Sequence, residues 1–349
     1  MQADPAPPLR IVAIGGGTGL ATLLRGLKRY VPAREGLEPT FSPSIEITAV
    51  VTVTDDGGSS GRLRREFDVL PPGDIRNCMV ALCEDEALLS RVFDYRFSSG
   101  RGLKGHSFGN LFLTALTNIT GDFAGAVSLS SEILASRGKI YPSTHSNVAL
   151  EATLANGRIV TGETRISKSR SRIEKIRLSA RRCQPLPATL EAIANADLIT
   201  FGPGSLFTSV IPNLLVDGIP EAIEASPALK AYFVNLMWQP GETLGFTAAD
   251  HVEAIRKHAR RRRVLDYIVL NTAPIRAAMR RKYEAEKSRP VLNDEARLRS
   301  MGLEIVGAPL AVERNKVRHN PEAAAAIAVK LAETGRGVRV SRSLSRSAV

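Results

Sequence analysis

The residues best suited to chemistry lie in three glycine-rich turns, each of which follows an apolar run. The first turn comes after Ile11–Ile14 and contains Gly15, Gly16, Gly17, Thr18 and Gly19. Glycine lets a phosphate approach the backbone, and the helix predicted to follow offers unpaired N–H groups. No Gly-Lys-Ser/Thr follows, so this is not a Walker A loop, and Leu20 replaces the third glycine of a dinucleotide fingerprint. We interpret it as a phosphate-binding turn of another type, with a plain strand-to-helix turn as the alternative.

The second turn, Thr54–Gly61, places two adjacent carboxylates after a β-branched apolar run. Asp55 and Asp56 carry the oxygen ligands that Mg²⁺ prefers, so they are candidate metal ligands beside a diphosphate. They could instead bind ribose or sugar hydroxyls, or form a solvated turn with an aspartate N-cap. An arginine directly after the turn is suited to pairing with phosphate. The other candidate ligands of this segment are Ser59, Ser60 and Arg62.

The third turn follows the apolar run Leu198–Phe201 and opens a predicted helix. Hydroxyl groups at a helix N-terminus lie beside unpaired N–H groups, which is an arrangement suited to an anion. The candidate ligands of this turn are Gly202, Gly204, Ser205, Thr208 and Ser209. Each turn alone is a weak signal, but three polar turns after predicted strands indicate one ligand site.

Two further polar segments begin predicted helices. The first, Pro71–Asn77, contributes Asp74, Arg76 and Asn77, of which Asp74 could be only a helix cap. The second, Gly105–Asn110, contributes His106 and Asn110, although a lone histidine is more often structural than catalytic. No Ser-His-Asp order, HExxH motif or Cys/His zinc spacing occurs, so the sequence supports neither a hydrolase nor a zinc site.

Strand–helix alternation supplies the scaffold that these turns need. It predicts an α/β fold with a mostly parallel sheet and helices on both faces, and ligands bind outside the carboxyl ends of such strands. Residues 73–136 have helical spacing. Two alternating runs around Asn156-Gly157 predict a hairpin within a small β-rich insertion at residues 138–180. The predicted strands of the later part are Asp197–Phe201, Ala231–Asn235, Leu265–Asn271 and Glu304–Ala308, followed by a helix at Pro321–Thr334.

The composition restricts the protein class. The chain of 349 residues has 44% hydrophobic residues, three cysteines and a formal charge of +12. Three scattered cysteines form no disulfide framework. No apolar run reaches the roughly 18–20 residues of a membrane span. The N-terminus has no signal sequence. We therefore expect a cytoplasmic protein, with a disordered N-terminus at residues 1–9 and a disordered basic tail at 335–349. The charge suggests nucleic acid, but no binding signature or interleaved aromatic residues support that partner.

These segments, in this order, resemble the YvcK-type gluconeogenesis factors, which belong with the CofD-like 2-phospho-L-lactate transferases. The resemblance extends over about residues 9–333, and we expect one domain at residues 10–334. The motifs that carry it are Ile14–Gly19, Thr54–Arg64, Pro71–Asn77, Gly105–Leu111, Gly202–Ser209, Asn235–Thr243 and Thr247–Val252.

The resemblance implies a Rossmann-like three-layer α/β/α fold and a protein that binds UDP-N-acetylglucosamine. It implies roles in gluconeogenic growth, cell shape and control of peptidoglycan precursors, acting through a regulatory protein partner that the sequence does not identify. Tyr283 and Arg318 match the residues that hold the nucleotide sugar in this family. The transferase branch instead uses Mg²⁺, and an enzyme of that class is the alternative function. Pro321 follows Asn320 where some relatives carry a phosphorylated threonine, and the resemblance is compatible with a homodimer.

Overall fold

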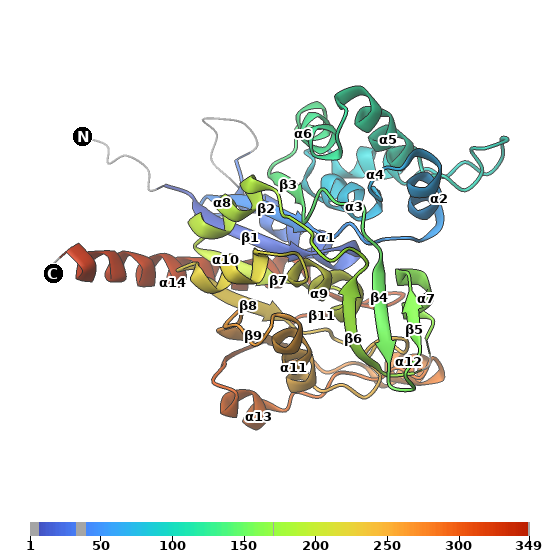
Figure 1. Ribbon diagram of the computed structural model, residues 1–349. Helices are drawn as coiled ribbons and strands as arrows, with labels where there is room; N and C mark the ends of the chain where they lie inside the picture. The colour runs from blue at the N-terminus through green and yellow to red at the C-terminus, as the bar shows by residue number, and fades with distance from the viewer. Residues whose placement is uncertain (1–6, 33–39, 170, 348–349) are drawn as a thin grey trace.

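A seven-stranded sheet forms the centre of the molecule (Figure 1), and every pairing within it is parallel. The computed structural model describes the chain except residues 1–6, 33–39, 170 and 348–349. The strand order is β10-β9-β8-β7-β1-β2-β3. In chain order these strands are β1 (Leu9–Gly15), β2 (Ile45–Val51), β3 (Lys139–Pro142), β7 (Leu198–Phe201), β8 (Leu229–Phe233), β9 (Tyr267–Asn271) and β10 (Glu304–Ala308). The predicted α/β class and parallel sheet are confirmed.

The order of the strands reverses between β1 and β7. The chain proceeds from β1 to β2 and β3 on one side, and then returns to place β7 against the other side of β1. Such a reversal leaves a crevice at the carboxyl ends of the two strands, because their connections leave in opposite directions. The first and third glycine-rich turns follow these two strands, so the topology brings them together.

Helices cover both faces of the sheet, and side chains of β1 alternate between two hydrophobic cores. Val12 and Ile14 belong to one core, while Ile11 and Ala13 belong to the other. The first core packs beneath α8 (Pro187–Asn195), the π-helical turn Leu206–Val210, α9 (Ile211–Leu214), α10 (Ile219–Ala225), α11 (Ala248–His258) and α13 (Glu295–Ser300). The second packs beneath α1 (Gly17–Leu27), α3 (Gly73–Leu82), α5 (Phe108–Thr120), α6 (Phe123–Ile133) and α14 (Pro321–Ser347).

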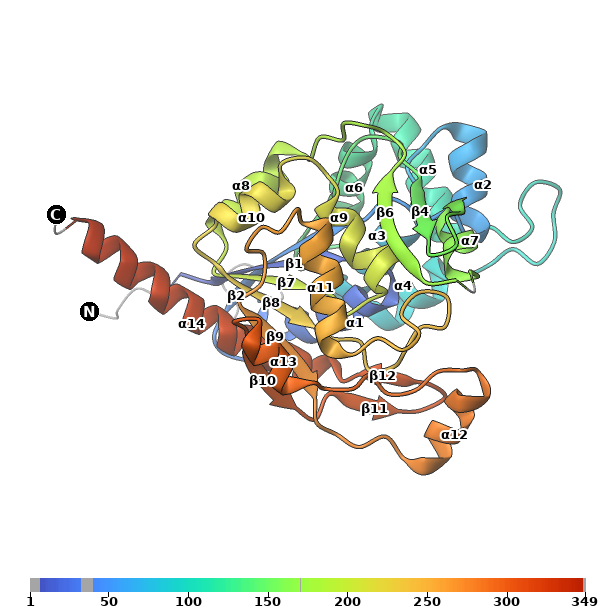
Figure 2. The same cartoon turned by 60° about the horizontal axis from the view of Figure 1, so that its bottom comes forward.

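The predicted helical character of residues 73–136 is confirmed. Helix α4 (Glu86–Phe93) completes this region, and α2 (Gly58–Phe67) directly precedes it. The short 3-10 turn Lys28–Tyr30 ends α1, and α12 (Ala277–Ala285) lies beside the antiparallel pair β11 (Ala311–Glu313) and β12 (Val317–His319) in Figure 2. In the described part of the chain no single helix is long and apolar enough to cross a membrane. One bent pair, Leu206–Leu214 with Ile219–Ala225, meets those criteria by length and composition only.

A second sheet of three antiparallel strands forms the predicted β-rich insertion. It contains β4 (Leu150–Leu154), β5 (Ile159–Thr161) and β6 (Ile173–Leu178), with the short helix α7 (Glu163–Ser167) between the last two. Gly157 has φ of 79° in the turn between β4 and β5, as the predicted Asn-Gly hairpin requires. The predicted start at residue 138 is wrong, because β3 pairs in parallel with β2 as an edge strand of the large sheet.

The predicted disorder at both ends is also corrected. Leu9 already pairs with Ile45 in the sheet, and residues 1–6 lie outside the described part of the chain. Helix α14 continues to Ser347, although Arg- and Ser-rich composition predicted a disordered tail from Gly335. The physical reason is a buried acceptor: Asp197 is fully buried at the start of β7 and pairs with arginines of α14.

Replacing Arg336 by alanine is expected to lower the free energy of unfolding by about 1–3 kcal/mol, because a buried carboxylate then loses a charged partner. The Arg336 guanidinium donates to Asp197 and to the carbonyls of Pro7 and Pro8, so it also fastens the N-terminal segment. Urea unfolding measures the effect. Arg280→Ala on the exposed face of α12 is the matched control, and an equal loss in both variants would contradict the assigned contact.

Candidate functional site

The candidate site is a cavity of about 370 Å³ at the carboxyl ends of β1, β7 and β8. It lies at the reversal of strand order, where the topology predicts a ligand. The first and third glycine-rich turns form one side, and the segment after β8 together with β12 forms the other. The sequence-predicted residues that line it are Gly16, Gly17, Thr18, Gly19, Asp74, Gly204, Ser205, Ser209, Tyr283 and Arg318.

The two glycine-rich turns touch each other through backbone. A Cβ atom on Gly19 would lie 2.7 Å from the Cα of Gly204, and closer still to the carbonyl oxygen of Pro203. Asn213 joins the turns from below, because its Nδ2 donates to the carbonyls of Gly15 and Ser209 at 3.3 and 2.8 Å. Helix α1 therefore begins at the cavity in a fixed position, and no side chain caps its N-terminus. An uncapped helix start is suited to receiving an anion.

Two carboxylates in the cavity have raised pKa values. Burial raises the pKa of Asp74 to about 7. Repulsion by the Asp55 carboxylate contributes to this rise, whereas the hydrogen bond from the Gly17 N–H opposes it. Burial likewise raises the pKa of Glu163 well above its usual value, and Asp74 and Asp55 contribute. Its Oε2 is buried without a hydrogen-bond partner. An anionic ligand is therefore favoured when these groups are protonated and can donate hydrogen bonds.

The two residues assigned by family resemblance both lie at the cavity. Arg318 on β12 donates from Nη1 to the Thr18 hydroxyl at 3.1 Å, which places its guanidinium over the first turn. The Tyr283 hydroxyl accepts the Val317 N–H at 3.0 Å. Tyr283 therefore positions β12 and, through it, the neighbouring arginine.

Several lining residues were missed from the sequence as site residues. Gln239 donates from Nε2 to the Ser205 hydroxyl at 2.6 Å, and its Oε1 accepts from Asn235 at 3.0 Å. Asn235 and Gln239 follow β8 at the same sheet edge as the glycine turns. Their position after a predicted strand could have identified them as site residues. Glu163 had no such signal, because it comes from the antiparallel insertion. The remaining missed residues of the lining include Trp238 and His319.

Other predicted residues form a buried polar network behind the cavity rather than its lining. The Ser59 hydroxyl bonds His106 Nδ1 at 2.9 Å, and Arg76 donates to Ser107 and Asn110 at 2.8 and 3.3 Å. These bonds fix the starts of α2, α3 and α5 around Asp74. Burial lowers the pKa of His106, and the nearby Arg62 lowers it further. The predicted residues outside the lining are Gly15, Asp55, Asp56, Ser59, Ser60, Arg62, Arg76, Asn77, His106, Asn110, Gly202 and Thr208.

Asp55 and Asp56 lie outside the cavity lining, and each accepts hydrogen bonds from neighbouring residues. Asp56 accepts the N–H and hydroxyl of Thr164, which attaches α7 to the second turn. Asp55 accepts the Gly57 N–H at 2.8 Å. In the part of the chain that the structure describes, no three His, Cys, Asp or Glu side chains are grouped to hold a metal ion. Magnesium in nucleotide sites is commonly held by one or two carboxylates together with water and ligand phosphate, so Mg²⁺ at this pair stays a prediction, and we assign no step to it.

A buried glutamate links the third turn to the insertion. Glu242 accepts from the backbone N–H of Phe207 and the hydroxyls of Thr208 and Ser167, at 3.1–3.2 Å. Its exposed fraction is 5%. Thr208, predicted as a ligand, is thereby used to hold the turn in place.

The fold and cavity first define a class: a Rossmann-like α/β protein with a polar pocket over the carboxyl ends of parallel strands. Residues 11–311 match the protein family described as 2-phospho-L-lactate transferase CofD. The chain belongs to this family, on the branch whose members are named gluconeogenesis factors.

The similarity extends over nearly the whole chain. The gluconeogenesis factor of Bacillus subtilis is 46% identical over 323 residues, which cover 92% of this chain and 98% of the relative. That of Halalkalibacterium halodurans is 47% identical over 311 residues, covering 89% and 92%. A crystal structure of a UPF0052 family member from Bacillus halodurans has a TM-score of 0.85 at 45% identity, covering 92% of this chain and 99% of that one. The resemblance seen in the sequence is confirmed.

Proposed function

We propose that this protein is a cytoplasmic regulator that binds UDP-N-acetylglucosamine and acts in gluconeogenic growth, cell shape and the control of peptidoglycan precursors. The observation that carries the proposal is the cavity at the reversal of strand order, where two glycine turns meet and Arg318 lies above them. A diphosphate would lie over Gly17 and Gly204. The uridine and sugar would extend toward Tyr283 and Gln239.

Hydrogen-bond donors and acceptors around the cavity suit a sugar with hydroxyl and amide groups. The Ser205 hydroxyl and Gln239 amide are already bonded to each other, so their remaining donors and acceptors are oriented. The unpartnered Oε2 of Glu163 is available to accept from a hydroxyl or, when protonated, to donate to an oxygen. This combination of donors and acceptors supports the binding of a sugar nucleotide.

Isothermal titration calorimetry with UDP-N-acetylglucosamine tests the ligand, with UDP and GTP as competitors. Saturable binding of the sugar nucleotide, tighter than either competitor, is the expected result. No binding at millimolar ligand, together with tight GTP binding, would overturn the proposal. Growth of a deletion strain on a gluconeogenic carbon source, with and without the wild-type gene, tests the physiological role.

Replacing Arg318 by alanine is expected to weaken UDP-N-acetylglucosamine binding by about tenfold or more, because a charge-assisted bond to phosphate is lost. The same calorimetric titration measures the change. Arg280→Ala, which removes an exposed cation from α12, is the control and should leave the affinity unchanged. Equal affinities in wild type and Arg318→Ala would remove this residue from the site.

The family match and one feature of the cavity favour a second candidate, a transferase of the CofD class. A carboxyl group with a pKa of about 7, such as that of Asp74, is suited to proton transfer at neutral pH. Turnover of a lactyl-diphospho-guanosine donor that is lost in Asp74→Asn would support this candidate. Absence of turnover alongside tight binding of the UDP-sugar would favour the regulator.

A further inference from the structure

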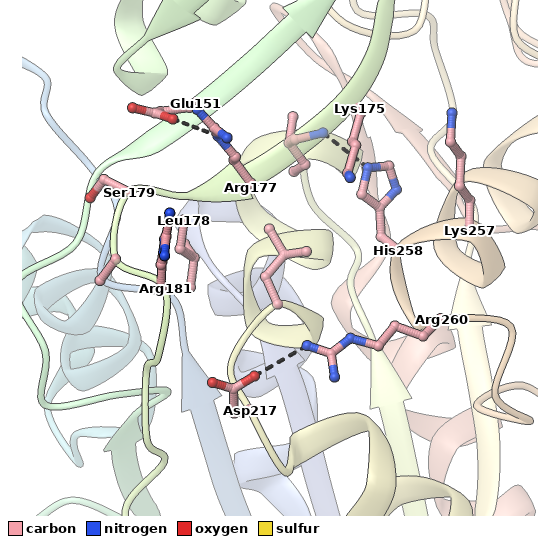
Figure 3. Close-up of a pocket in the computed structure, with 13 residues that line it drawn as sticks. Glu151, Lys175, Arg177, Leu178, Ser179, Arg181, Asp217, Lys257, His258 and Arg260 are labelled. Carbon is pink, nitrogen blue, oxygen red and sulfur yellow. Dashed lines mark hydrogen bonds and ion pairs between the residues drawn. The ribbon is translucent and has the colours of Figure 1, made fainter.

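A second cavity, of about 590 Å³, lies at the β6 edge of the antiparallel insertion, whereas the insertion contributes Glu163 of α7 to the glycine-turn cavity. Figure 3 shows that its wall combines β6 and the segment after it, the loop between α9 and α10, and the end of α11. None of its lining residues belongs to the candidate nucleotide site.

Hydrogen bonds and an ion pair hold the three wall segments together. His258, at the end of α11, accepts the Ile176 N–H through Nε2 at 3.0 Å and donates from Nδ1 to Ala254. Burial lowers the pKa of His258 to about 4, so the imidazole is neutral and keeps this arrangement. Asp217 accepts from the Cys183 N–H and pairs with Arg260, whose side chain extends across the cavity in Figure 3. The cavity is therefore formed before any ligand arrives.

The lining carries an excess of three positive charges. Arg177 pairs with Glu151 and Arg260 pairs with Asp217, which compensates both carboxylates of the lining. The uncompensated cations are Lys175, Arg181 and Lys257. Lys257 donates to the Glu174 carbonyl at 2.7 Å, which directs its ammonium group without neutralising it.

Two basic segments of the sequence converge here. Residues 168–182 and 256–263 are both rich in lysine and arginine, and 73 residues separate them in the chain. A basic run at a helix end stabilises the helix dipole, which explains the second segment alone. It does not explain why the first segment faces it across a cavity. The juxtaposition concentrates positive potential in a concave site, which favours binding of an anion.

The nature of the wall indicates a small anion rather than an acidic peptide strand. An extended peptide would need the free edge of β6, but His258 and Lys257 already bond its Ile176 N–H and Glu174 carbonyl. Leu178 and Leu215 supply an apolar part of the lining between the cations. The volume is in the range of about 300–1,000 Å³ that small-molecule pockets occupy.

We propose that this cavity is a second ligand site, which binds a small metabolite carrying two or more phosphate or carboxylate groups. Lys175 and Lys257, which both lie near His258, hold one acidic end, and Arg181 on the opposite side holds the other. The site is independent of the nucleotide pocket, so its existence does not depend on the proposed nucleotide function.

Calorimetric titration of the full-length protein with inorganic pyrophosphate and, separately, citrate tests the proposal at low salt. We expect at least one of them to bind, and the comparison distinguishes a phosphate from a carboxylate site. The double variant Lys175→Ala/Arg181→Ala should weaken that binding by about tenfold or more. Both side chains are exposed, and Arg181→Glu alone provides a second variant should the double variant unfold.

The double variant Arg101→Ala/Lys104→Ala is the matched control, because it removes the same charge from an exposed loop far from β6. It should leave the anion affinity unchanged. The proposal is overturned if neither anion binds at millimolar concentration, or if both double variants weaken binding equally. It is also overturned if only Arg318→Ala weakens binding, since the anion then occupies the nucleotide pocket, or if an oligonucleotide binds and neither small anion does.

Discussion

Replacing Gly19 by alanine is expected to abolish measurable binding of UDP-N-acetylglucosamine, with a loss of affinity of about 100-fold or more. The added Cβ would lie 2.7 Å from the Cα of Gly204 and would overlap the Pro203 carbonyl. Both obstacles are backbone, so no side-chain rotation relieves them. The two glycine turns must separate, and the diphosphate then loses one of its two walls.

The same strain is expected to lower the free energy of unfolding by about 1–3 kcal/mol, as overpacked sites do. Binding should be measured by calorimetry at a temperature where circular dichroism shows the variant folded. Gly15→Ala is the matched control from the same turn: its Cβ would meet Leu20 at 3.5 Å, an ordinary contact, and Gly15 does not line the cavity. If Gly19→Ala binds the ligand as tightly as Gly15→Ala, the turns do not form the phosphate site.

Binding of the sugar nucleotide is expected to weaken by about tenfold between pH 6 and pH 8.5, because an ionised carboxylate repels the diphosphate. The pKa of Asp74 is about 7, so Asp74 is largely protonated at the lower pH, and burial shifts the pKa of Glu163 in the same direction. An anionic ligand raises both pKa values further. The complex therefore takes up protons, and its affinity falls as the pH rises through 7.

Calorimetry in buffers of different ionisation enthalpy measures this proton uptake directly. Asp74→Asn should remove much of the pH dependence, while Glu132→Gln on the exposed face of α6 should retain it. An affinity in the wild type that is independent of pH would contradict the assigned role of Asp74.

The free energy of unfolding of the ligand-free protein should also decrease as the pH rises. A carboxyl whose pKa is raised on folding contributes fully below its unfolded pKa of about 4, and this contribution is lost as the pH rises through 7. Urea unfolding of the wild type and of Asp74→Asn at pH 6 and at pH 8.5 measures the contribution of Asp74.

Local sequence determined much of this protein. β-branched apolar runs and the glycines after them located β1, β2 and β7 with their turns, and Asn156-Gly157 located the hairpin between β4 and β5. These features depend on neighbouring residues, whose backbone preferences and hydrophobic periods are readable in a single chain. The family also followed from the order of the motifs, and Tyr283 and Arg318 followed from the family.

Only the tertiary structure decided which turns meet. The pairing of β7 with β1 places the third turn against the first, while the carboxylates of the second turn are bonded to Thr164 and Gly57 outside the cavity. Strand order is set by contacts between residues far apart in the chain, and no local pattern encodes it. Burial raises the pKa of Asp74, and it arises from that same packing.

The net positive charge of the chain also has one aspect that the sequence determines and another that the tertiary structure determines. Its amount is a property of the sequence, but tertiary contacts decide what each cation does. Arg336 stabilises a helix that composition alone predicted to be disordered, because Asp197 is buried beside it. Lys175 and Lys257 face one cavity because β6 packs against α11. Charge is a property of residues, whereas electrostatic potential depends on where folding places them.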